Sequence, residues 1–295
     1  MAKRTVSFQK EDKTILSCDG ESSLFVRQYS KGQAKLHFIL VHGAVEHSGR
    51  YEDLIHYLFN NYNDLVLTTY DHLGHGKSGG TKAYVDHFEI YIKDFIQVTN
   101  LAQEKNNSET KTFILAHSLG GLITLSALLD TNYHFPLSPQ GIIFSSPCIK
   151  PRVMLPLLSK PILEGMNQFT PKFHLPLIYR GAELTRDPLR ANDFDADPLI
   201  PKFMCVRTAK EIIEASERII GLSYYLKVPC LFLIAGDDKI VDSEATMLFA
   251  QGMEKDKVEL IGYPGRYHEL WNEGNRQDIF KTMKVWIDKE VKESL

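Results

Sequence analysis

The sequence contains few cysteines, and their positions exclude the common metal-binding patterns. The four cysteines in 295 residues are Cys18, Cys148, Cys205 and Cys230. They lie far apart in the chain and match no ligand spacing of a zinc site. We interpret them as free thiols of a protein in a reducing compartment, with one disulfide as the alternative.

Long apolar runs and blocks of like charge are also absent. No stretch approaches the roughly 18 apolar residues that a membrane-spanning helix needs. Residues 1–12 are basic but lack the apolar run of a signal peptide, so we expect a cytoplasmic protein. The formal net charge of −3 predicts no long-range attraction to nucleic acid or anionic lipid. The sequence shows no internal repeat and no low-complexity segment.

Short apolar runs alternate with segments of helical periodicity along most of the chain. This alternation is typical of a parallel sheet covered by helices on both faces. The residues predicted to form buried strands are 36–41, 65–70, 112–116, 141–145, 229–235 and 258–261. The residues predicted to form helices are 51–60, 88–105, 122–129, 243–253 and 276–292. Shorter alternating runs at 5–8 and 24–29 predict antiparallel edge strands.

The alternation stops after Pro147 and resumes at about residue 229. Between these points the sequence is helical in pattern, interrupted by prolines, and has no run suited to a buried strand. We therefore predict an insertion at residues 148–226, flanked by two parts of one sheet domain at 1–147 and 227–295.

Ser118 lies between the predicted strand 112–116 and the predicted helix 122–129. A strand, a tight turn and a helix form the context of a nucleophile elbow, in which the residues two before and two after the serine must be small. Ala116 and Gly120 occupy these positions, so the motif reads A-x-S-x-G. The alternative is a serine that caps the helix in an ordinary loop.

A serine nucleophile needs a histidine base and an acid that orients the base. On an α/β-hydrolase sheet both follow the serine, the acid first, each just after a strand. The pair Asp237-Asp238 follows the strand 229–235, and His268 follows the strand 258–261. Each could separately be a turn aspartate or a surface histidine, but the order and the positions together favour a catalytic triad.

Backbone N–H groups must stabilise the negative oxygen that forms during acyl transfer. One donor is expected at Leu119, directly after the serine. The loop after the strand 36–41 begins His42-Gly43-Ala44, and its glycine allows the backbone to bend toward the serine, which favours the N–H of Ala44 as the second donor. A plain glycine turn is the alternative.

The segment Asp71-His72-Leu73-Gly74-His75 is the one cluster that suggests a metal site. No third histidine or distant carboxylate completes a plausible ligand set. We interpret the segment as a glycine-rich loop whose buried polar side chains hold the floor of the site, and we predict no metal and no cofactor.

These motifs resemble the monoacylglycerol lipase and lysophospholipase branch of the α/β-hydrolases. The resemblance covers nearly the whole chain. Its most specific motifs are HGAVEHSGRY at residues 42–51, DHLGHGKSGG at 71–80 and HSLGG at 117–121, and it extends to DADPL at 195–199, DKIVD at 238–242 and YPGRYH at 263–268.

The resemblance implies an α/β-hydrolase fold: an eight-stranded, mostly parallel sheet with a helical cap inserted after the sixth strand. It also implies that Asp238 rather than Asp237 is the acid of the triad. Glu46 and Arg50 match positions that hold the glycerol end of a monoglyceride, although an internal salt bridge is an equal alternative. Mammalian members carry a second histidine where this chain has Trp271, which leaves the head group open. Trp271 is close to His268 in the sequence and could bind the quaternary ammonium of a phosphocholine head group with its aromatic face, which keeps a lysophospholipase as an alternative.

Two apolar, proline-kinked segments of the insertion supply further expectations. Residues 153–158 and 173–178 could line an acyl tunnel and rest on a membrane surface, or they could only pack on the sheet domain. The resulting prediction is a serine ester hydrolase of single-chain acyl lipids that cleaves monoacylglycerols. The alternatives are a lysophospholipase, a short-chain carboxylesterase, or a catalytically silent relative that acts as a binding module. The sequence does not define an oligomeric state.

Overall fold

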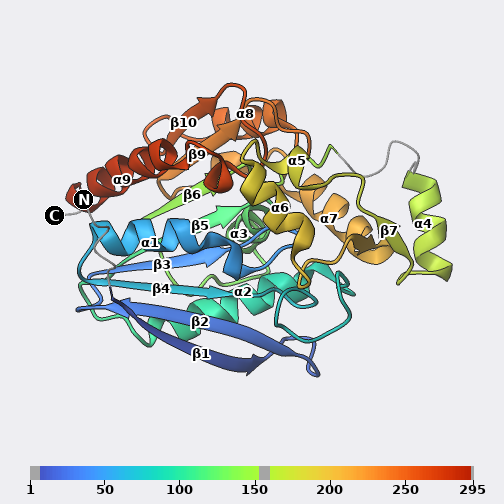
Figure 1. Cartoon of the computed structure of the whole chain (residues 1–295), viewed down its shortest axis with the longest axis horizontal. Helices are drawn as coiled ribbons and strands as arrows, with labels where there is room; N and C mark the ends of the chain where they lie inside the picture. Colours follow the sequence, from blue (N-terminus) through green and yellow to red (C-terminus); the bar gives the residue numbers. More distant parts are fainter. Residues whose placement is uncertain (1–6, 153–159, 294–295) are drawn as a thin grey trace.

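A computed structural model of the chain describes residues 7–152 and 160–293, and its central element is an eight-stranded sheet (Figure 1). The strand order is β1-β2-β4-β3-β5-β6-β9-β10. Strand β2 runs antiparallel to its neighbours β1 and β4, and the other neighbouring strands run parallel. The strands are β1 (Gln9–Leu16), β2 (Ser23–Lys31), β3 (Leu36–Val41), β4 (Leu65–Tyr70), β5 (Lys111–His117), β6 (Gly141–Ser145), β9 (Cys230–Ala235) and β10 (Val258–Tyr263). The mostly parallel sheet predicted from the sequence is confirmed.

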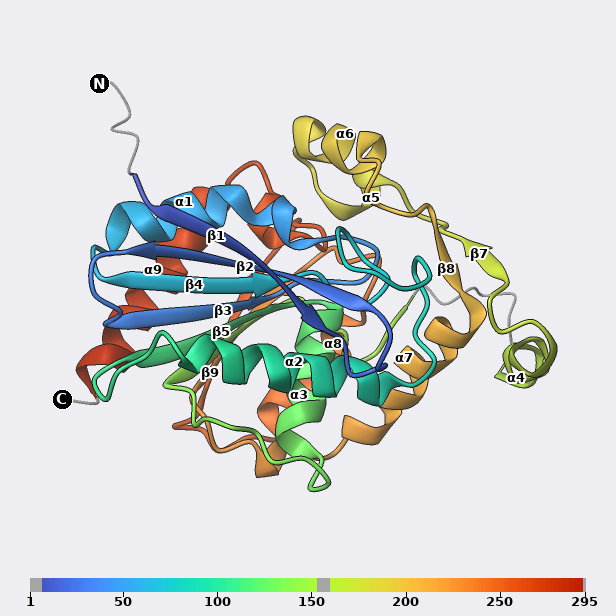
Figure 2. The ribbon, with the colours of Figure 1, turned by 90° about the horizontal axis from the view of Figure 1, so that it is seen from below.

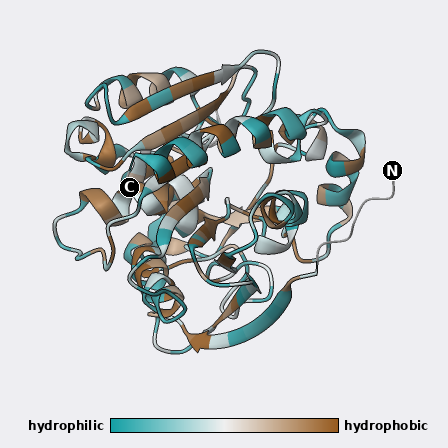
Figure 3. Ribbon diagram, turned by 90° about the vertical axis from the view of Figure 1, so that its left-hand side faces the viewer, coloured by the Kyte–Doolittle hydropathy of each residue, from teal (hydrophilic) through white to brown (hydrophobic). Residues whose placement is uncertain are grey.

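Helices cover both faces of the sheet (Figure 2). Helices α1 (Glu52–Asn61) and α9 (Arg276–Lys292) pack on one face, and α2 (Phe88–Gln103), α3 (Leu119–Leu129) and α8 (Ser243–Gln251) pack on the other. Each face buries its own hydrophobic cluster, because β3, β4, β5, β6 and β9 carry apolar side chains in both directions. Figure 3 shows this pattern as hydrophobic strands surrounded by helices of mixed hydropathy.

The position predicted for the first strand is wrong. Ser7 and Phe8 lie outside any strand, and the edge strand is β1, whose sequence QKEDKTIL is mostly charged or polar. An edge strand pairs through its backbone and exposes most side chains, so its hydrophobic pattern is weak. Charged side chains on such an edge also discourage pairing with other chains. The predicted residues 5 and 6 lie outside the described residues.

The chain leaves the sheet after the sixth strand, β6, and returns at β9; we call residues 146–229 the inserted segment. It lies beyond the carboxyl ends of the parallel strands (Figure 1). Its elements are α4 (Lys160–Phe169), β7 (His174–Pro176), α5 (Gly181–Leu184), α6 (Pro188–Ala196), β8 (Phe203–Cys205), α7 (Val206–Ile219) and the 3-10 helix η2 (Ser223–Tyr225).

The antiparallel pair β7–β8 was not expected, because strands of three residues leave no readable periodicity in a sequence. Across residues 7–152 and 160–293, none of the helices combines the length and the apolar character that crossing a bilayer requires.

Candidate active site

Ser118 occupies a strained turn between β5 and α3. Its backbone has φ +49° and ψ −114°, a conformation that residues other than glycine rarely adopt. The turn brings α3 so close to β3 that a Cβ on Gly120 would lie 2.2 Å from the carbonyl oxygen of Val41. This close approach is the physical reason for a glycine two positions after the serine.

The structure brings Ser118, His268 and Asp238 together from the ends of three strands. His268 Nε2 lies 2.9 Å from Ser118 Oγ, and His268 Nδ1 lies 2.8 Å from Asp238 Oδ2. The other oxygen of Asp238 accepts the N–H groups of Ile240 and Val241, at 2.8 and 3.0 Å. The carboxylate is therefore held in place, and its hydrogen bond requires the proton of the neutral imidazole to be on Nδ1. That tautomer leaves Nε2 free to accept the serine proton.

The electrostatics of the site suit a general base. Burial by itself lowers the pKa of His268, but the charge and the hydrogen bond of Asp238 outweigh burial and raise that pKa above its usual value of 6.5. Burial raises the pKa of Asp238, but His268 and the two backbone N–H groups lower it overall. Nearby His117 differs, because burial lowers its pKa to about 3 and keeps its imidazole neutral.

The two adjacent aspartates have different partners. Asp238 is buried against His268, whereas Asp237 is half exposed and forms an ion pair with Arg186 of the inserted segment at 3.0 Å. Only Asp238 reaches the imidazole in this arrangement, so the geometry agrees with the assignment that the resemblance implied.

The loop after β3 folds back against the nucleophile. The N–H of Gly43 donates to Glu46 Oε1 at 2.6 Å, so it is already engaged, and the next N–H along the chain belongs to Ala44. A Cβ on Gly43 would lie 3.2 Å from the Cβ of Ser118, which shows how closely the loop approaches the serine. Ala44, Leu119 and Ser118 line one pocket together. Their positions fit the expected pair of oxyanion donors.

The suspected metal cluster is a hydrogen-bonded floor beneath this loop. His42 and His72 have ring centroids 3.8 Å apart, and the N–H of His72 donates to His42 Nε2 at 2.9 Å. Asp71 accepts the N–H groups of Ser48 and Lys77, each at 2.8 Å. Among residues 7–152 and 160–293, no group of three or more histidine, cysteine or carboxylate side chains has an arrangement that could hold a metal ion.

Glu46 and Arg50 form an internal salt bridge, the second of the two alternatives that the sequence left open. Arg50 Nη1 donates to Glu46 Oε2 at 3.2 Å. The same guanidinium donates with both Nη atoms to Glu269, and Nη2 lies 2.7 Å from Oε2. Sequence reasoning missed Glu269. The only available signal was an acidic residue directly after His268, and its partner Arg50 lies 219 positions earlier.

Trp271 is buried in the hydrophobic cluster on the α1 and α9 side of the sheet. Its ring packs at 5.8 Å from Tyr51 and at 6.1 Å from His117, measured between ring centroids. It lines neither of the two pockets that reach Ser118. A direct contact between Trp271 and a head group therefore has no support in this geometry.

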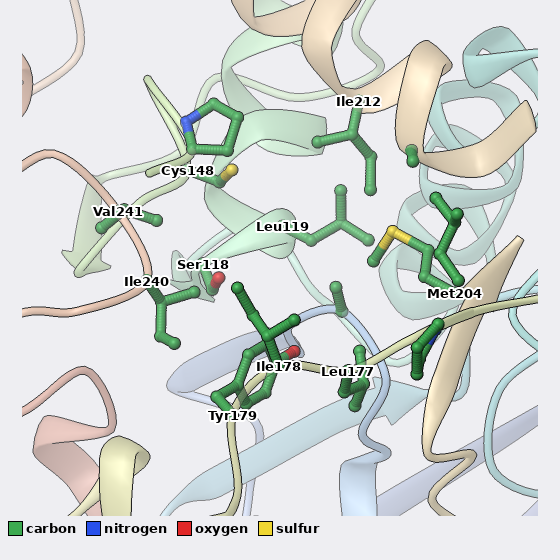
Figure 4. A pocket seen from close by; sticks show the side chains of 15 residues that line it. Ser118, Leu119, Cys148, Leu177, Ile178, Tyr179, Met204, Ile212, Ile240 and Val241 are labelled. Carbon is green, nitrogen blue, oxygen red and sulfur yellow. The ribbon is translucent and has the colours of Figure 1, made fainter. Parts of the chain in front are cut away.

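An apolar pocket extends from Ser118 beneath the inserted segment (Figure 4). Its walls come from the elbow, α7 and the strand β7 with the residues that follow it. Among the lining residues are Leu119, Leu175, Leu177, Ile178, Met204 and Ile212. The second of the two predicted tunnel segments, 173–178, thus contributes to this lining, while 153–158 lies outside the described residues. Cys148 also lines the pocket as a buried thiol, and its burial raises the pKa to about 12.

A smaller pocket lies on the other side of Ser118 and is more polar. Ser118, His268, Glu46 and Glu269 line it, together with aromatic side chains that include Tyr179. Ser118 thus stands where an apolar and a polar pocket meet. This arrangement can hold an ester whose acyl and alcohol parts differ in polarity.

The inserted segment has two unlike parts. The clamped half, residues 181–200, is tied to the core by ion pairs of Arg190 with Asp53 at 2.5 Å and of Arg276 with Asp187 at 3.0 Å, and by a hydrogen bond between His47 Nε2 and Asp197 Oδ2 at 2.8 Å. The apolar half, residues 160–178, packs through α4 on α7 and through β7 on β8. It exposes the large apolar side chains of Ile162, Phe169, Phe173 and Ile178.

Comparison with known protein families places these features in context. Residues 32–275 match the family model described as serine aminopeptidase, S33. The chain is 30% identical over 289 residues to a monoglyceride lipase of Rattus norvegicus, covering 94% of this chain and 90% of that protein. It is 29% identical over 262 residues to phospholipase YtpA of Bacillus subtilis, covering 86% of this chain and 95% of that protein.

Two further matches concern length and fold. The chain is 28% identical to Escherichia coli protein YnbC over 91% of its own length but spans 45% of that protein. A crystal structure of a soluble variant of monoglyceride lipase from Saccharomyces cerevisiae, in complex with a substrate analog, superposes with a TM-score of 0.82. It covers 98% of both chains at 19% sequence identity, so this likeness shows a common fold.

Proposed function

Because the match spans residues 32–275, the chain belongs to the family described as serine aminopeptidase, S33, within the α/β-hydrolases, and we propose that it is a monoacylglycerol lipase. It cleaves the ester bond of a single-chain acyl glycerol and releases a fatty acid and glycerol. The observation that carries the proposal is the meeting of an apolar and a small polar pocket at Ser118. A monoacylglycerol has the matching division, with a long acyl chain on one side of the ester and a compact diol on the other.

The mechanism follows from the geometry of the three side chains. Ser118 Oγ attacks the ester carbonyl while His268 Nε2, 2.9 Å away, takes its proton, and Asp238 stabilises the imidazolium that forms. The N–H groups of Ala44 and Leu119 stabilise the oxyanion. His268 then protonates the leaving alcohol, which leaves an acyl ester on Ser118. Water, activated by the same histidine, releases the fatty acid. This sequence of steps requires no cofactor.

The polar pocket supports an uncharged alcohol as the leaving group. It presents the carboxylates of Glu46 and Glu269, and Arg50 is already bound to both of them. A diol can donate hydrogen bonds to carboxylate oxygens, whereas the phosphate of a lysophospholipid would face a cluster in which two carboxylates outnumber one guanidinium. Glu46 is therefore the proposed glycerol contact, joined by Glu269, and Arg50 acts through them. Trp271 is proposed to pack behind His117 rather than to touch the substrate.

We also propose that residues 148–226 form a cap and that its apolar half rests transiently on a membrane surface. Support comes from the exposed apolar side chains of Ile162, Phe169 and Phe173, which precede β7 in the chain, and β7 contributes Leu175 and Pro176 to the lining of the acyl pocket. The four cysteines are all free thiols, which supports the proposal of a cytoplasmic location.

Substrates with one acyl chain and different alcohols test the proposal. The purified protein would be assayed with 1-lauroylglycerol, lauroyl-lysophosphatidylcholine and p-nitrophenyl laurate. We expect kcat/KM for the monoglyceride to exceed that for the lysophospholipid by at least about tenfold, because like-charge contact costs several kcal/mol. Faster cleavage of the lysophospholipid would identify a lysophospholipase, and cleavage of p-nitrophenyl esters alone would identify a carboxylesterase. A protein that cleaves none of them would be a binding module.

A further inference from the structure

Three buried charged side chains connect the loop that carries the catalytic histidine to the loop after β3. Arg50 lies on the 3-10 helix η1 (Ser48–Tyr51) and binds Glu269 through both Nη atoms and Glu46 through Nη1. The side chains of Arg50, Glu46 and Glu269 are only 7%, 4% and 5% exposed. A planar guanidinium that donates two hydrogen bonds to one carboxylate fixes both the distance between the two groups and their relative orientation.

Each end of this bridge is attached to a part of the catalytic machinery. Glu269 directly follows His268, and its N–H donates to the carbonyl oxygen of Leu184 at 2.8 Å. Glu46 accepts the N–H of Gly43 at 2.6 Å and the hydroxyl of Tyr51 at 2.5 Å. The side chain of Glu46 thereby holds the peptide N–H of Gly43, which directly precedes Ala44.

The loop needs this support because its backbone is strained. Val45 is a buried β-branched residue with φ +48°, a strained conformation that persists only where the surrounding structure enforces it. Val45 lies between Ala44 and Glu46, inside the turn that the bond from Gly43 to Glu46 closes. Weakening the anchor at Glu46 would let the strain relax and move the N–H of Ala44.

The charges also make the bridge dependent on all three members. Burial raises the pKa of Glu46, and Arg50 opposes this; the pKa of Glu269 is lowered overall, because Arg50 outweighs its burial. Removing one partner leaves the other charges buried and poorly paired, which is strongly destabilising at such sites. The two ion pairs of Arg50 therefore depend on the positions of both loops.

We propose that Glu269 is a positioning residue, which acts through Arg50 and Glu46 to set the N–H of Ala44 at the correct distance from His268. The base and the oxyanion donor then act on the same tetrahedral intermediate. This role concerns ester cleavage at Ser118 and does not depend on which alcohol leaves, so it stands apart from the choice of a monoglyceride as substrate.

Three variants test the role: Glu269→Gln, Glu269→Asp and Arg50→Lys. The assay uses p-nitrophenyl butyrate, whose leaving group has no aliphatic hydroxyl to bind a carboxylate. We expect Glu269→Gln to lower kcat by about 10- to 100-fold with KM within about threefold, because a displacement of about 1 Å can reduce the rate about 100-fold. Glu269→Asp keeps the charge and should recover part of the rate. Arg50→Lys keeps the positive charge but loses the two-donor geometry of the guanidinium. Its kcat should therefore lie between those of Glu269→Gln and the parent protein.

Affinity for an alkylboronic acid provides a second measurement. Such a compound forms a tetrahedral adduct with the serine and places an oxygen against the oxyanion donors. Its affinity should fall by the same factor as kcat/KM in each variant.

The matched control is Arg27→Lys. Arg27 forms a similar forked pair with Asp12, at 2.5 and 2.7 Å, between β1 and β2 at the edge of the sheet. This variant should leave kcat and boronate affinity unchanged even if it lowers the melting temperature. The proposal is overturned if Glu269→Gln keeps kcat within twofold, if kcat falls without a loss of boronate affinity, or if only monoglyceride cleavage is affected. Should Glu269→Gln fail to fold, Arg50→Lys and Glu269→Asp decide the question by the same criteria.

Discussion

The two halves of the inserted segment meet the same nucleophile in opposite ways. The clamped half, 181–200, is joined to α1 and α9 by ion pairs and to the loop after β3 by the hydrogen bond between His47 and Asp197. Phe194 of this half lies under the guanidinium of Arg50, 4.9 Å from ring centroid to Cζ, and lines the polar pocket. The apolar half, 160–178, lines the apolar pocket with Leu175, Leu177 and Ile178, and contacts the core through fewer charged groups among the residues described.

This difference matches what each pocket has to do. Hydrogen bonds and ion pairs depend strongly on distance and angle, so a polar pocket works only if its walls are held in place. Apolar contacts are non-directional, so the wall of an acyl pocket can shift with the length of its occupant. One insertion thus supplies a polar wall held by directional contacts and an apolar wall held by non-directional contacts, on the two sides of one serine.

Ser118 is the serine that both halves of the inserted segment face. Removing its hydroxyl should abolish the contribution of both halves to ester cleavage. Ser118→Ala should lower kcat by a factor on the order of 10⁶, because the members of a triad act as a unit. A fluorophosphonate probe should label the parent protein and fail to label the variant. Undiminished labelling would mean that another residue is the nucleophile and that the two pockets do not meet at the reacting atom.

The adjacent aspartates separate catalysis from clamping. Asp238→Asn should lower kcat about 10⁴-fold, because the amide disrupts the orientation and tautomer of His268. Asp237→Asn removes an exposed ion pair with Arg186 of the clamped half and should lower kcat by about tenfold at most. Steady-state kinetics on p-nitrophenyl butyrate would compare them. A larger loss in Asp237→Asn would show that the two aspartates have been assigned the wrong way round.

The pH dependence should report the acidic surroundings of His268. The pKa of its imidazole lies above 6.5, and the catalytic base must be neutral, so kcat/KM should fall about tenfold per pH unit below that pKa. Stability should respond in the opposite sense. The folded state binds this proton more tightly than the unfolded state, so the contribution of His268 is present below pH 6.5 and is lost as the pH rises through the raised pKa.

A pH series of kcat/KM and of the melting temperature for the parent protein and for Glu269→Gln checks both statements. The acidic limb should move to lower pH in the variant, because Glu269 is one of the charges that raise the pKa of His268. An unmoved limb would contradict the electrostatic description of this site.

The apolar half should determine how activity changes with acyl length. Each buried CH₂ contributes roughly 0.8 kcal/mol, or about fourfold in kcat/KM when the gain reaches the transition state. Activity on a series of p-nitrophenyl esters should rise until the pocket is filled. Ile178→Trp should shorten the preferred chain, because Ile178 lines the pocket while half of it is exposed. An equal profile from acetate to laurate would show that the acyl pocket is not used.

The smallest effect is expected for a single ion pair of the clamped half. Asp53→Asn leaves Arg190 and Arg276 without their shared carboxylate and should lower stability by about 1 kcal/mol, or a few degrees in melting temperature. Asp278→Asn, which removes an exposed pair with Lys281, is the control and should have no measurable effect. Added salt should reduce the difference between parent and Asp53→Asn, because it screens partly exposed charges.

The sequence predicted the elements that are buried on both faces better than those at the edge. The strands β3, β4, β5, β6 and β9 appear as continuous apolar runs because each of their faces is covered. Strand β1 was displaced in the prediction because its charged side chains face solvent. The pair β7–β8 left no pattern because three residues are too few to show a period.

The residues of the candidate site likewise divide into those that the sequence predicts and those that it does not. Ser118, His268 and the pair Asp237-Asp238 could be predicted as candidates because a parallel sheet brings residues at strand ends to one edge, and the family resemblance pointed to Asp238 within that pair. The second partner of Arg50 could not be found, because Glu269 lies on another loop and neither residue belongs to a periodic pattern. Trp271 was expected near a head group from its distance to His268 along the chain, but the 3-10 helix η3 (Leu270–Asn272) directs its ring into the core beside Tyr51.

From the sequence alone, the class of fold, the order of the strands buried on both faces and Ser118 as the candidate nucleophile could be predicted. These depend on local periodicity, turn chemistry and chain order, which a linear sequence contains in full. The tertiary structure alone decided which charges meet, that Arg50 is held by Glu269, and which part of the inserted segment faces each pocket. Such contacts join residues that are far apart in the chain, and their energies depend on burial and on distances of a few ångströms that exist only after the chain has folded.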